Sequence, residues 1–321
     1  MNAHLRTVVV VSVIPLLVGV CTATAGDLNP PPGPLTPTMK TLLEVEPRIA
    51  INEQNTPGDS DAVFAITEPG SYYLTGALIG VEGKNGIRLS SGNVCIDLDG
   101  YEVVGPGSGD GIVSPYGDVK ENVTIRNGIV RGWTNGIRLD HTSSVHLRDV
   151  AVSENALNGI YTGGPGIVEG CLARNNGRGI SGYGTVTVRN CVATENQLQG
   201  IEVAFSCVVE GCIAFDNPGS GIVVSDNGNV VRGCFCRTNA VGLECVGTRT
   251  RIEENHVVDN AVGIRVAGSR NLVISNSAAL NSTQDYDIGV GNAYGPIVNV
   301  AGVGDISGVA GANHPWANVS H

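Results

Sequence analysis

Short runs in which apolar and polar residues alternate recur along most of the chain, and the run "TVTVRN" at residues 185–190 is typical. Strict alternation places every second side chain on one face of a strand, so each run predicts a short strand with one buried face. Gly and Asn separate the runs, and 45 of the 321 residues are Gly while only 4% are aromatic. The pattern therefore predicts an all-β protein whose core consists of small and branched side chains.

A glycine followed by Ile or Leu recurs at steps of 20 to 25 residues. The glycines are Gly86, Gly111, Gly136, Gly159, Gly179, Gly200, Gly221, Gly242 and Gly263, with a weaker copy at Asp287-Ile288. Such a period indicates one structural unit per repeat, and it is too short for the common helical repeats and lacks the leucines of leucine-rich repeats. The remaining architecture is a single-stranded right-handed parallel β-helix of about ten turns with N- and C-terminal caps, in which glycine permits the bends.

Asparagine forms a second column with nearly the same period. Its members are Asn155, Asn176, Asn196, Asn217, Asn239, Asn260 and Asn281. Asparagine tolerates the left-handed conformation of a sharp corner. Amides on turns about 4.8 Å apart can also hydrogen-bond along the coil axis, so we expect an asparagine ladder at one corner.

Charged residues form a third column in which the sign alternates from turn to turn. The column comprises Arg148, Glu169, Arg189, Glu210, Arg232 and Glu253. Stacked strands would make these side chains direct neighbours on one outer face, where opposite charges attract. Each exposed pair contributes only about 0–1 kcal/mol, so the alternation is better interpreted as register control than as bulk stability.

A fourth column consists of Cys171, Cys191, Cys212 and Cys234 at an inward position. Adjacent turns are close enough for disulfides, but side chains in register point the same way, which favours stacked free thiols. A metal site is disfavoured because no C-x-x-C pair occurs and no nearby histidine completes a ligand set with Cys234 and Cys236.

The N-terminal residues 1–25 have the features of a secretory signal: Arg6, an apolar run and an A-x-A cleavage site that ends at Ala25. Lipid attachment at Cys21 is the alternative, but the preceding Val20 is large for it, so we expect ordinary cleavage after Ala25. The mature protein is then secreted or located in the cell envelope.

The rest of the chain divides into four segments. Residues 26–40 form a proline-rich leader, residues 41–84 an N-terminal cap with the first turn, residues 85–289 the repeats and residues 290–321 a C-terminal cap. In the second cap, Trp316 is expected to pack rather than to bind a ligand.

The formal net charge is −11, or −12 once Arg6 is removed with the signal. An acidic surface repels nucleic acid and anionic headgroups, so neither is expected as a partner. It also disfavours polyuronic acids unless a cation intervenes. After the signal, no segment is apolar enough to span a membrane.

Four stretches resemble secreted bacterial proteins that carry right-handed parallel β-helix repeats. They are "EPGSYYLTG" (68–76), "GNVCIDLDGYEV" (92–103), the "NGI…GCxAxxN" repeat and "NHPWANVSH" (313–321). The resemblance covers residues 41–321 and is specific for the fold. The wider fold, which resembles that of pectate lyases, polygalacturonases, alginate epimerases and phage tailspikes, implies a carbohydrate ligand by analogy. The "GHG" and "RIK" stretches of polygalacturonases do not occur here.

Two pairs of aspartates are candidates for a cation site. Asp97 and Asp99 flank Leu98, so on a strand both carboxylates would lie on one outer face about 7 Å apart. Asp285 and Asp287 have the same spacing. Calcium is the candidate cation because it binds converging oxygen ligands. Solvated strand residues are the structural alternative for both pairs, and the sequence favours that alternative.

Asp140 and His141, in the stretch "RLDHTSS", are candidates for acid–base chemistry together with Asp97 and Asp99. A carboxylate beside histidine can tune a proton acceptor, but sequential neighbours on a strand face opposite ways, and a polar surface corner is the alternative. The outward residues that follow each Gly-Ile pair are too mixed to form an aromatic track for sugars.

Two functions follow from these features. The first is a non-catalytic extracellular scaffold, adhesion or glycan-binding module, which the regular turns and missing catalytic motifs favour. The second is a calcium-assisted polysaccharide lyase or epimerase that acts on uronic-acid polymers, with Asp97, Asp99, Asp140 and His141 as its residues. No organic cofactor is expected, because no phosphate-binding loop occurs.

Overall fold

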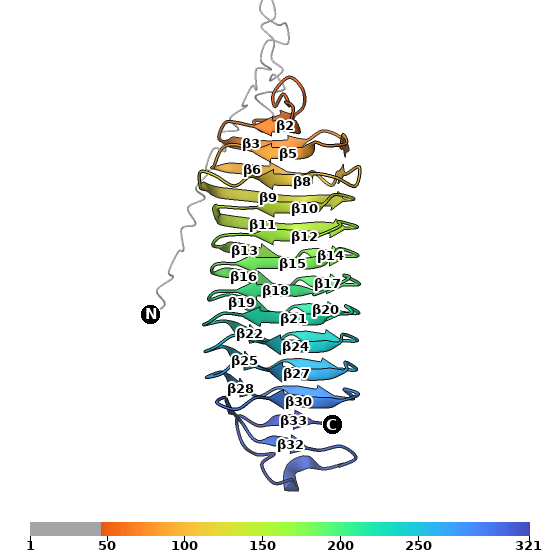
Figure 1. Cartoon of the computed structure of the whole chain (residues 1–321), viewed down its shortest axis with the longest axis vertical. Coiled ribbons are helices and arrows are strands. Elements are labelled where there is room, and N and C mark those ends of the chain that lie inside the picture. Colours follow the sequence, from red (N-terminus) through yellow and green to blue (C-terminus); the bar gives the residue numbers. More distant parts are fainter. Residues whose placement is uncertain (1–45) are drawn as a thin grey trace, which may run out of the picture. The chain divides into compact units, whose positions relative to one another are not determined.

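The computed structural model describes residues 46–321, which wind into one coil of stacked parallel strands (Figure 1). The strands form two sheets, here named sheet A and sheet B, of 22 and 11 strands. The predicted signal, Cys21 and the proline-rich leader lie outside the described residues. No helix in residues 46–321 is long and apolar enough to cross a membrane.

Sheet B contains one strand per turn. Its strands are β2 (Ala62–Ile66), β5 (Asn85–Leu89), β8 (Asp110–Ser114), β10 (Asn135–Leu139), β12 (Asn158–Thr162), β15 (Arg178–Tyr183), β18 (Ile201–Ala204), β21 (Ser220–Ser225), β24 (Val241–Cys245), β27 (Val262–Val266) and β30 (Gln284–Ile288). Each pairs in parallel with the strand of the next turn, as β12 does with β15.

Sheet A contains two short strands in most turns, and in two of the early turns a single strand of 12 residues takes their place. The first are β1 (Ile49–Ile51), β3 (Gly70–Leu74), β4 (Leu78–Ile79), β6 (Val94–Asp97), β7 (Glu102–Val104), β9 (Lys120–Arg131) and β11 (Thr142–Ser153). The short pairs are β13 (Gly166–Glu169) with β14 (Leu172–Arg174), β16 (Val186–Arg189) with β17 (Val192–Thr194), β19 (Val208–Glu210) with β20 (Ile213–Phe215), β22 (Val230–Arg232) with β23 (Phe235–Arg237), β25 (Arg251–Glu253) with β26 (His256–Val258) and β28 (Leu272–Ile274) with β29 (Ser277–Ala279). The sheet closes with β31 (Ala293–Tyr294), β32 (Ile297–Asn299) and β33 (Asn318–Ser320), and a 3₁₀ turn spans Ile306–Gly308.

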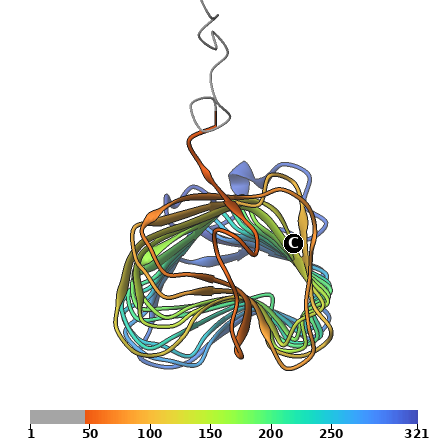
Figure 2. The same cartoon turned by 90° about the horizontal axis from the view of Figure 1, so that it is seen from above.

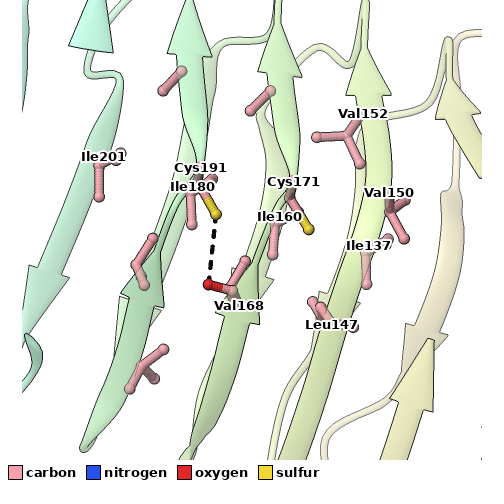
Figure 3. Packing of buried hydrophobic residues seen from close by; sticks show 14 of the residues in the cluster. Ile137, Leu147, Val150, Val152, Ile160, Val168, Cys171, Ile180, Cys191 and Ile201 are labelled. Atoms are coloured by element: carbon pink, nitrogen blue, oxygen red, sulfur yellow. Dashed lines mark hydrogen bonds between the residues drawn. The ribbon is translucent and has the colours of Figure 1, made fainter. Parts of the chain in front are cut away.

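The isoleucines of the Gly-Ile pairs lie one above another, as the repeat predicts. Ile137 pairs with Ile160, Ile160 with Ile180 and Ile180 with Ile201, and all four side chains are fully buried. Figure 3 shows this stripe together with the thiols of Cys171 and Cys191. Seen along the axis, successive turns superimpose around a common interior (Figure 2). The prediction of a right-handed parallel β-helix is confirmed.

The coil has about 13 turns, more than the ten or so that the repeat predicts. The additional turns lie at the ends, in segments where the Gly-Ile period is absent. Strand β1 pairs with β3 and β3 with β6, while β33 pairs with β29 and with β32. The ends therefore continue the stacking that the sequence shows only in its central part.

The glycines of the Gly-Ile column serve a purpose other than the expected bending. None of them has a positive φ. A Cβ on Gly179 would lie 2.4 Å from the carbonyl oxygen of Gly200 and 2.9 Å from Nδ2 of Asn196. Glycine is required there because the next turn approaches too closely for a side chain.

The asparagine ladder is present, and its members are buried except for the partly exposed Asn281. Asn176 Nδ2 donates to Asn196 Oδ1 over 3.0 Å, and Asn196 Nδ2 donates to Asn217 Oδ1 over 3.0 Å. The left-handed residue of the corner is the one before each ladder position, such as Asn175 with φ 55° or Glu195 with φ 55°. Of the two reasons expected for asparagine, hydrogen bonding between amides along the coil axis is confirmed. Tolerance of the left-handed conformation is wrong as a reason, because that conformation lies one residue earlier.

All eight cysteines among the described residues are free, which confirms the expected stack of thiols. The packing predicted for Trp316 is wrong, because 58% of its side chain is exposed. The buried tryptophan is Trp133, whose Nε1 donates to the carbonyl oxygen of Val103 over 3.0 Å. Trp133 lies beside glycines of neighbouring turns such as Gly80 and Gly105, whose missing side chains leave room for the indole.

Candidate functional site

Asp97 lies at the end of β6, and its carboxylate is occupied by protein groups. Arg126 Nη2 lies 2.9 Å and Arg48 Nη1 3.3 Å from Oδ2, while Asn127 Nδ2 donates to Oδ1 over 3.1 Å. Burial alone would raise the pKa of Asp97, but hydrogen bonds from the Asp99 amide, Asn127 and Arg126 lower it. Asp97 therefore joins neighbouring turns as an ionised carboxylate.

Asp99 does not share a strand face with Asp97, because β6 ends at Asp97. Asp99 is exposed in the following turn with a φ of 51°, and its amide donates to Asp97 Oδ1 over 2.9 Å. The expected geometry, two outward carboxylates on one strand, is wrong for this pair.

Asp285 and Asp287 both lie in β30 and are also engaged. Asp285 Oδ1 accepts from Asn281 Nδ2 over 2.8 Å and ends the asparagine ladder, while its other oxygen accepts from Ser320. Asp287 Oδ2 lies 3.3 Å from Nε of Arg265.

The described chain, residues 46–321, contains no group of three His, Cys, Asp or Glu side chains arranged to hold a metal ion. The donor sets at Asp97, Asp99, Asp285 and Asp287 therefore do not fit calcium, which needs several converging oxygen ligands.

Asp140 and His141 follow β10 at the edge of sheet B and contact different neighbours. Asp140 Oδ2 lies 2.5 Å from Nη1 of Arg138. The His141 ring lies against Tyr116, with ring centroids 4.0 Å apart, and its Nδ1 is 3.2 Å from the carbonyl oxygen of Gly117. Because a carbonyl oxygen only accepts, Nδ1 carries the proton, and in the neutral ring Nε2 has a free lone pair.

Arg138 connects these residues to the outer face of sheet B. Its Nε lies 2.7 Å from Asp110 Oδ2, so two carboxylates hold one guanidinium. Burial works against its charge, but the hydrogen bond to Asp110 and the charges of Asp110 and Asp140 raise the pKa of Arg138. Tyr161 lies next to Arg138 in register, and burial, aided by Asp140, raises the pKa of its phenol, which stays protonated at neutral pH.

Five aromatic side chains, counting the His141 imidazole, lie on or directly after five successive strands of sheet B, from β8 to β18. They are Tyr116, His141, Tyr161, Tyr183 and Phe205. The rings of Tyr161 and Tyr183 are 5.7 Å apart, and burial together with Glu202 raises the pKa of Tyr183 to about 12. Tyr116 is 77% and Phe205 51% exposed. We call these five residues the aromatic row.

Phe205 is held in a conformation that a bulky residue rarely adopts, with a φ of 69°, and Ser206 follows with a φ of 60°. Other corners of the coil adopt the same conformation, such as Thr185 with a φ of 62° and Arg249 with a φ of 55°, so it belongs to the fold. At this corner it presents an aromatic ring to solvent.

His141 is the one member of the aromatic row that the sequence marks as a candidate site residue. The position two residues after each glycine of the Gly-Ile column holds Tyr161 alone among aromatics. Three members of the row occupy the position five residues after a glycine of that column. Tyr116 follows Gly111, His141 follows Gly136 and Phe205 follows Gly200 at this spacing. This position is the corner that follows each strand of sheet B.

A hollow of about 450 Å³ adjoins the row on its N-terminal side and is lined in part by Arg88, Val113, Pro115 and Arg138. Arg88 is paired with Asp59 and Asp61. Arg88 and Arg138 are thus each held by carboxylates, and Val113 and Pro115 line the hollow between them.

This architecture defines a right-handed parallel β-helix. The family model described as "Right handed beta helix region" matches residues 78–235 and 186–299, and the chain belongs to this family. No curated protein matches the chain.

Two solved structures are similar in fold. One is the A-module of mannuronan C-5 epimerase AlgE6 from Azotobacter vinelandii, with a TM-score of 0.53 and 19% identity over 68% of this chain and 70% of that one. The other is the A-module of mannuronan C-5 epimerase AlgE4 from Azotobacter vinelandii, with a TM-score of 0.50 and 18% identity over 70% of this chain and 78% of that one. At this identity the likeness concerns the fold.

Proposed function

We propose that the protein is an extracytoplasmic β-helix that binds polysaccharide along the aromatic row of sheet B. The single observation that carries this proposal is the row itself, which extends over successive turns with Tyr116 and Phe205 well exposed. Sugar rings present apolar C–H faces that stack on aromatic rings, and a linear glycan can follow a row that runs along the coil axis. The predicted secretory signal places such a protein where polysaccharides occur.

The polar groups beside the row complement the hydroxyl groups of a sugar. Asp140 and Glu202 can accept hydrogen bonds, while the phenols of Tyr161 and Tyr183 can donate them. Burial keeps both phenols protonated, so they are donors at neutral pH. An ion pair with Arg138 holds Asp140 in place before a ligand arrives, and an ion pair with Arg178 holds Glu202.

A second candidate function is epimerase or lyase chemistry on the bound glycan, and one observation favours it. The contact with Gly117 directs the Nδ1 proton of His141 to the backbone, which leaves Nε2 as an available proton acceptor. In such a reaction Nε2 would take the C5 proton of a uronic acid. Arg138 is already bound by two carboxylates, so it would have to exchange one of them for the carboxylate of the sugar. Catalysis requires this exchange and binding along the row does not, so binding is the first candidate function.

Binding is tested with an array of neutral, amino and uronic-acid glycans, with and without calcium, followed by affinity measurements on variants. Tyr116→Ala and Phe205→Gly should each weaken binding about tenfold, since an aromatic contact contributes on the order of 1 kcal/mol beyond its buried area. Glycine at 205 preserves the left-handed backbone. The matched control is Phe215→Ala, which removes an exposed aromatic ring from sheet A and should leave binding unchanged.

The binding proposal fails if no glycan binds, or if Phe215→Ala weakens binding as much as the two row variants. Catalysis is tested separately, by measuring product release from whichever glycan binds. His141→Gln should abolish product even at glycan concentrations that saturate binding. Product release that survives replacement of Asp97, Asp99, Asp140 and His141 together would eliminate the predicted catalytic residues.

A further inference from the structure

Sheet B ends at β30 with an edge that no strand covers. Within residues 46–321, β30 pairs with β27 alone, whereas sheet A continues one turn further, through β33 to β32 (Figure 1). The N-terminal edge of sheet B is different, because the loop before β2 bonds to it. There Ala65 N–H donates to the carbonyl oxygen of Thr56, and Asp59 N–H donates to that of Ala62. Only the C-terminal edge of sheet B is therefore open.

The open edge carries backbone groups that point away from β27. In β27, the carbonyl oxygen of Val266 accepts a hydrogen bond from Gly289 N–H on the following turn. Ile288 pairs with Val266 in register, so its N–H and C=O point past the end of the sheet, as do those of Tyr286 two residues earlier. No backbone group of residues 46–321 bonds to them. Unpaired groups of this kind make an edge a template for another strand.

The inward side chains at this edge also lack part of their cover. Tyr286 and Ile288 are only partly buried, whereas their partners in β27, Ile264 and Val266, are 0% and 1% exposed. A strand added beyond β30 would remove this apolar surface from water, which is favourable. The edge thus offers both unpaired backbone groups and an apolar surface to an incoming strand.

The outward column of sheet B indicates the charge that an added strand needs. Glu244, Arg265 and Asp287 lie one above another with alternating signs. Arg265 Nε lies 3.3 Å from Asp287 Oδ2, and its Nη1 lies 3.8 Å from Glu244 Oε1. The side chain of Asp287 is 45% exposed, and the next residue of the column would lie beside it. A Lys or Arg there is attracted and an acidic residue is repelled.

The same charges disfavour a second copy of this chain as the occupant. Two β30 edges related by a two-fold axis would pair antiparallel. This pairing would place Asp285 and Asp287 of one copy opposite the same aspartates of the other, where like charges are destabilising. The edge therefore suits a strand of different sequence.

We propose that the open edge of β30 binds an extended segment of a partner protein by parallel strand addition, which repeats the geometry of every other strand of sheet B. The segment places aliphatic side chains over Tyr286 and Ile288 and a Lys or Arg beside Asp287. Strands of this chain have the same alternation, as "GIRV" in β27 does. The edge lies outside the aromatic row, which ends at β18, so this inference does not rest on the proposed glycan binding.

The experiment measures the binding of fluorescein-labelled peptides to the chain that begins at Gly26, by fluorescence anisotropy. The probe is the peptide of residues 260–269, which contains the sequence of β27. It should bind saturably, and the same peptide with Arg265→Glu should bind at least about tenfold more weakly. In the protein, Asp287→Arg should reverse this preference. The matched control is Asp216→Arg, which changes an exposed aspartate of sheet A and should leave the preference unchanged.

Two N-methylated peptides test whether backbone hydrogen bonds form at the edge. In the parallel arrangement, the N–H of Ala267 in the peptide faces β30, while that of Val266 faces away from it. Methylation at Ala267 should therefore weaken binding at least about tenfold, and methylation at Val266 should have little effect. In ¹H–¹⁵N NMR spectra of the protein, the backbone amides of Tyr286 and Ile288 should shift and exchange more slowly when the unmodified peptide binds.

Absence of peptide binding would overturn the proposal, as would equal affinity for the peptides with and without Arg265→Glu. Equal effects of the two methyl groups would exclude strand addition, and the reverse effects would exclude its parallel form. If the chain alone sediments as a dimer and the Tyr286 amide is already protected without peptide, a second copy occupies the edge, and the partner proposed here is wrong.

Discussion

At the scale of single residues, the ladder asparagines are the most demanding positions in the coil. Asn196 is fully buried. Its Nδ2 donates to Asn217 Oδ1 and to the carbonyl oxygen of Ala173. Its Oδ1 accepts from the backbone N–H and from Nδ2 of Asn176. One side chain thus satisfies groups in three successive turns. Removal of the amide leaves each of these groups without a partner, because water cannot reach them to replace it.

Asn196→Ala is expected to lower the free energy of unfolding by about 3 kcal/mol or more, because each buried group left unsatisfied costs about 1–3 kcal/mol. Urea unfolding followed by circular dichroism measures the change. Asn227→Ala, at an exposed position, is the control and should change stability by less than about 0.5 kcal/mol. A loss of similar size in both variants would show that the ladder has no special role.

The thiol column continues as a second asparagine ladder, which explains its residue types. Cys212 Sγ and Cys234 Sγ lie 3.5 Å and 3.7 Å from the carbonyl oxygens of Val188 and Val209, one turn back. In the next turn, Asn255 Nδ2 donates to the equivalent carbonyl of Val231 over 3.1 Å. Cysteine and asparagine therefore occupy one kind of site, as small buried groups that face a backbone carbonyl.

Cys234→Asn should change the free energy of unfolding by less than about 1 kcal/mol, because the new amide can donate to Val209 and extend the ladder from Asn255. Cys234→Leu, which adds bulk without a donor, should cost about 1–3 kcal/mol through overpacking. Thermal unfolding of the two variants side by side measures the difference. Equal destabilisation would mean that the site requires the thiol itself.

At the scale of elements, the charge column stabilises the pairing of neighbouring strands. Hydrogen bonds from His146 and Arg189 lower the pKa of Glu169 below its ordinary value of 4.5. In the unfolded chain this interaction is absent, so the carboxylate binds a proton more readily there. The stabilisation is therefore present above pH 4.5 and is lost as the pH falls through the lower, folded-state pKa.

Glu169→Gln is accordingly expected to destabilise the protein at pH 7 and to have little effect at acidic pH, where the native carboxylate is also protonated. Urea unfolding of both proteins across this range gives the comparison. Glu121→Gln, an exposed carboxylate without an ion pair in the described chain, serves as the control with no difference at either pH. A Glu169→Gln effect that stays constant with pH would exclude the ionic interaction as its cause.

Strand boundaries were harder to predict than strand existence. The alternation in "CIDLD" continues through Asp99, yet β6 ends at Asp97 because the chain turns there with Asp99 in the left-handed conformation. Arg48 and Arg126, which hold Asp97, come from other turns. A local pattern contains no information on such partners, so the predicted pair of outward carboxylates was wrong.

At the scale of the whole molecule, continuous stacking shields the interior. Seven of the eight cysteines are buried, and burial raises the pKa of Cys236, which suppresses the reactive thiolate. In the chain that begins at Gly26, iodoacetamide should modify only the partly exposed Cys95 under native conditions and all eight thiols in denaturant without reductant. Intact-mass spectrometry counts the modified sites. Thiols that stay blocked in denaturant would indicate disulfides and contradict the stacked thiols.

Periodicity determined the fold of this protein at the sequence level, because each turn packs on the next turn of nearly identical pattern. The Gly-Ile stripe, the asparagine ladder, the alternating charges and the thiol column are all contacts between residues about 21 positions apart, so they are visible as columns. Only the tertiary structure decided which carboxylates are engaged, where the coil ends and that Tyr116, His141, Tyr161, Tyr183 and Phe205 share one face. The engaged carboxylates and the ends of the coil depend on partners from other turns. The aromatic row combines residues from different positions of the repeat, so no single column contains it.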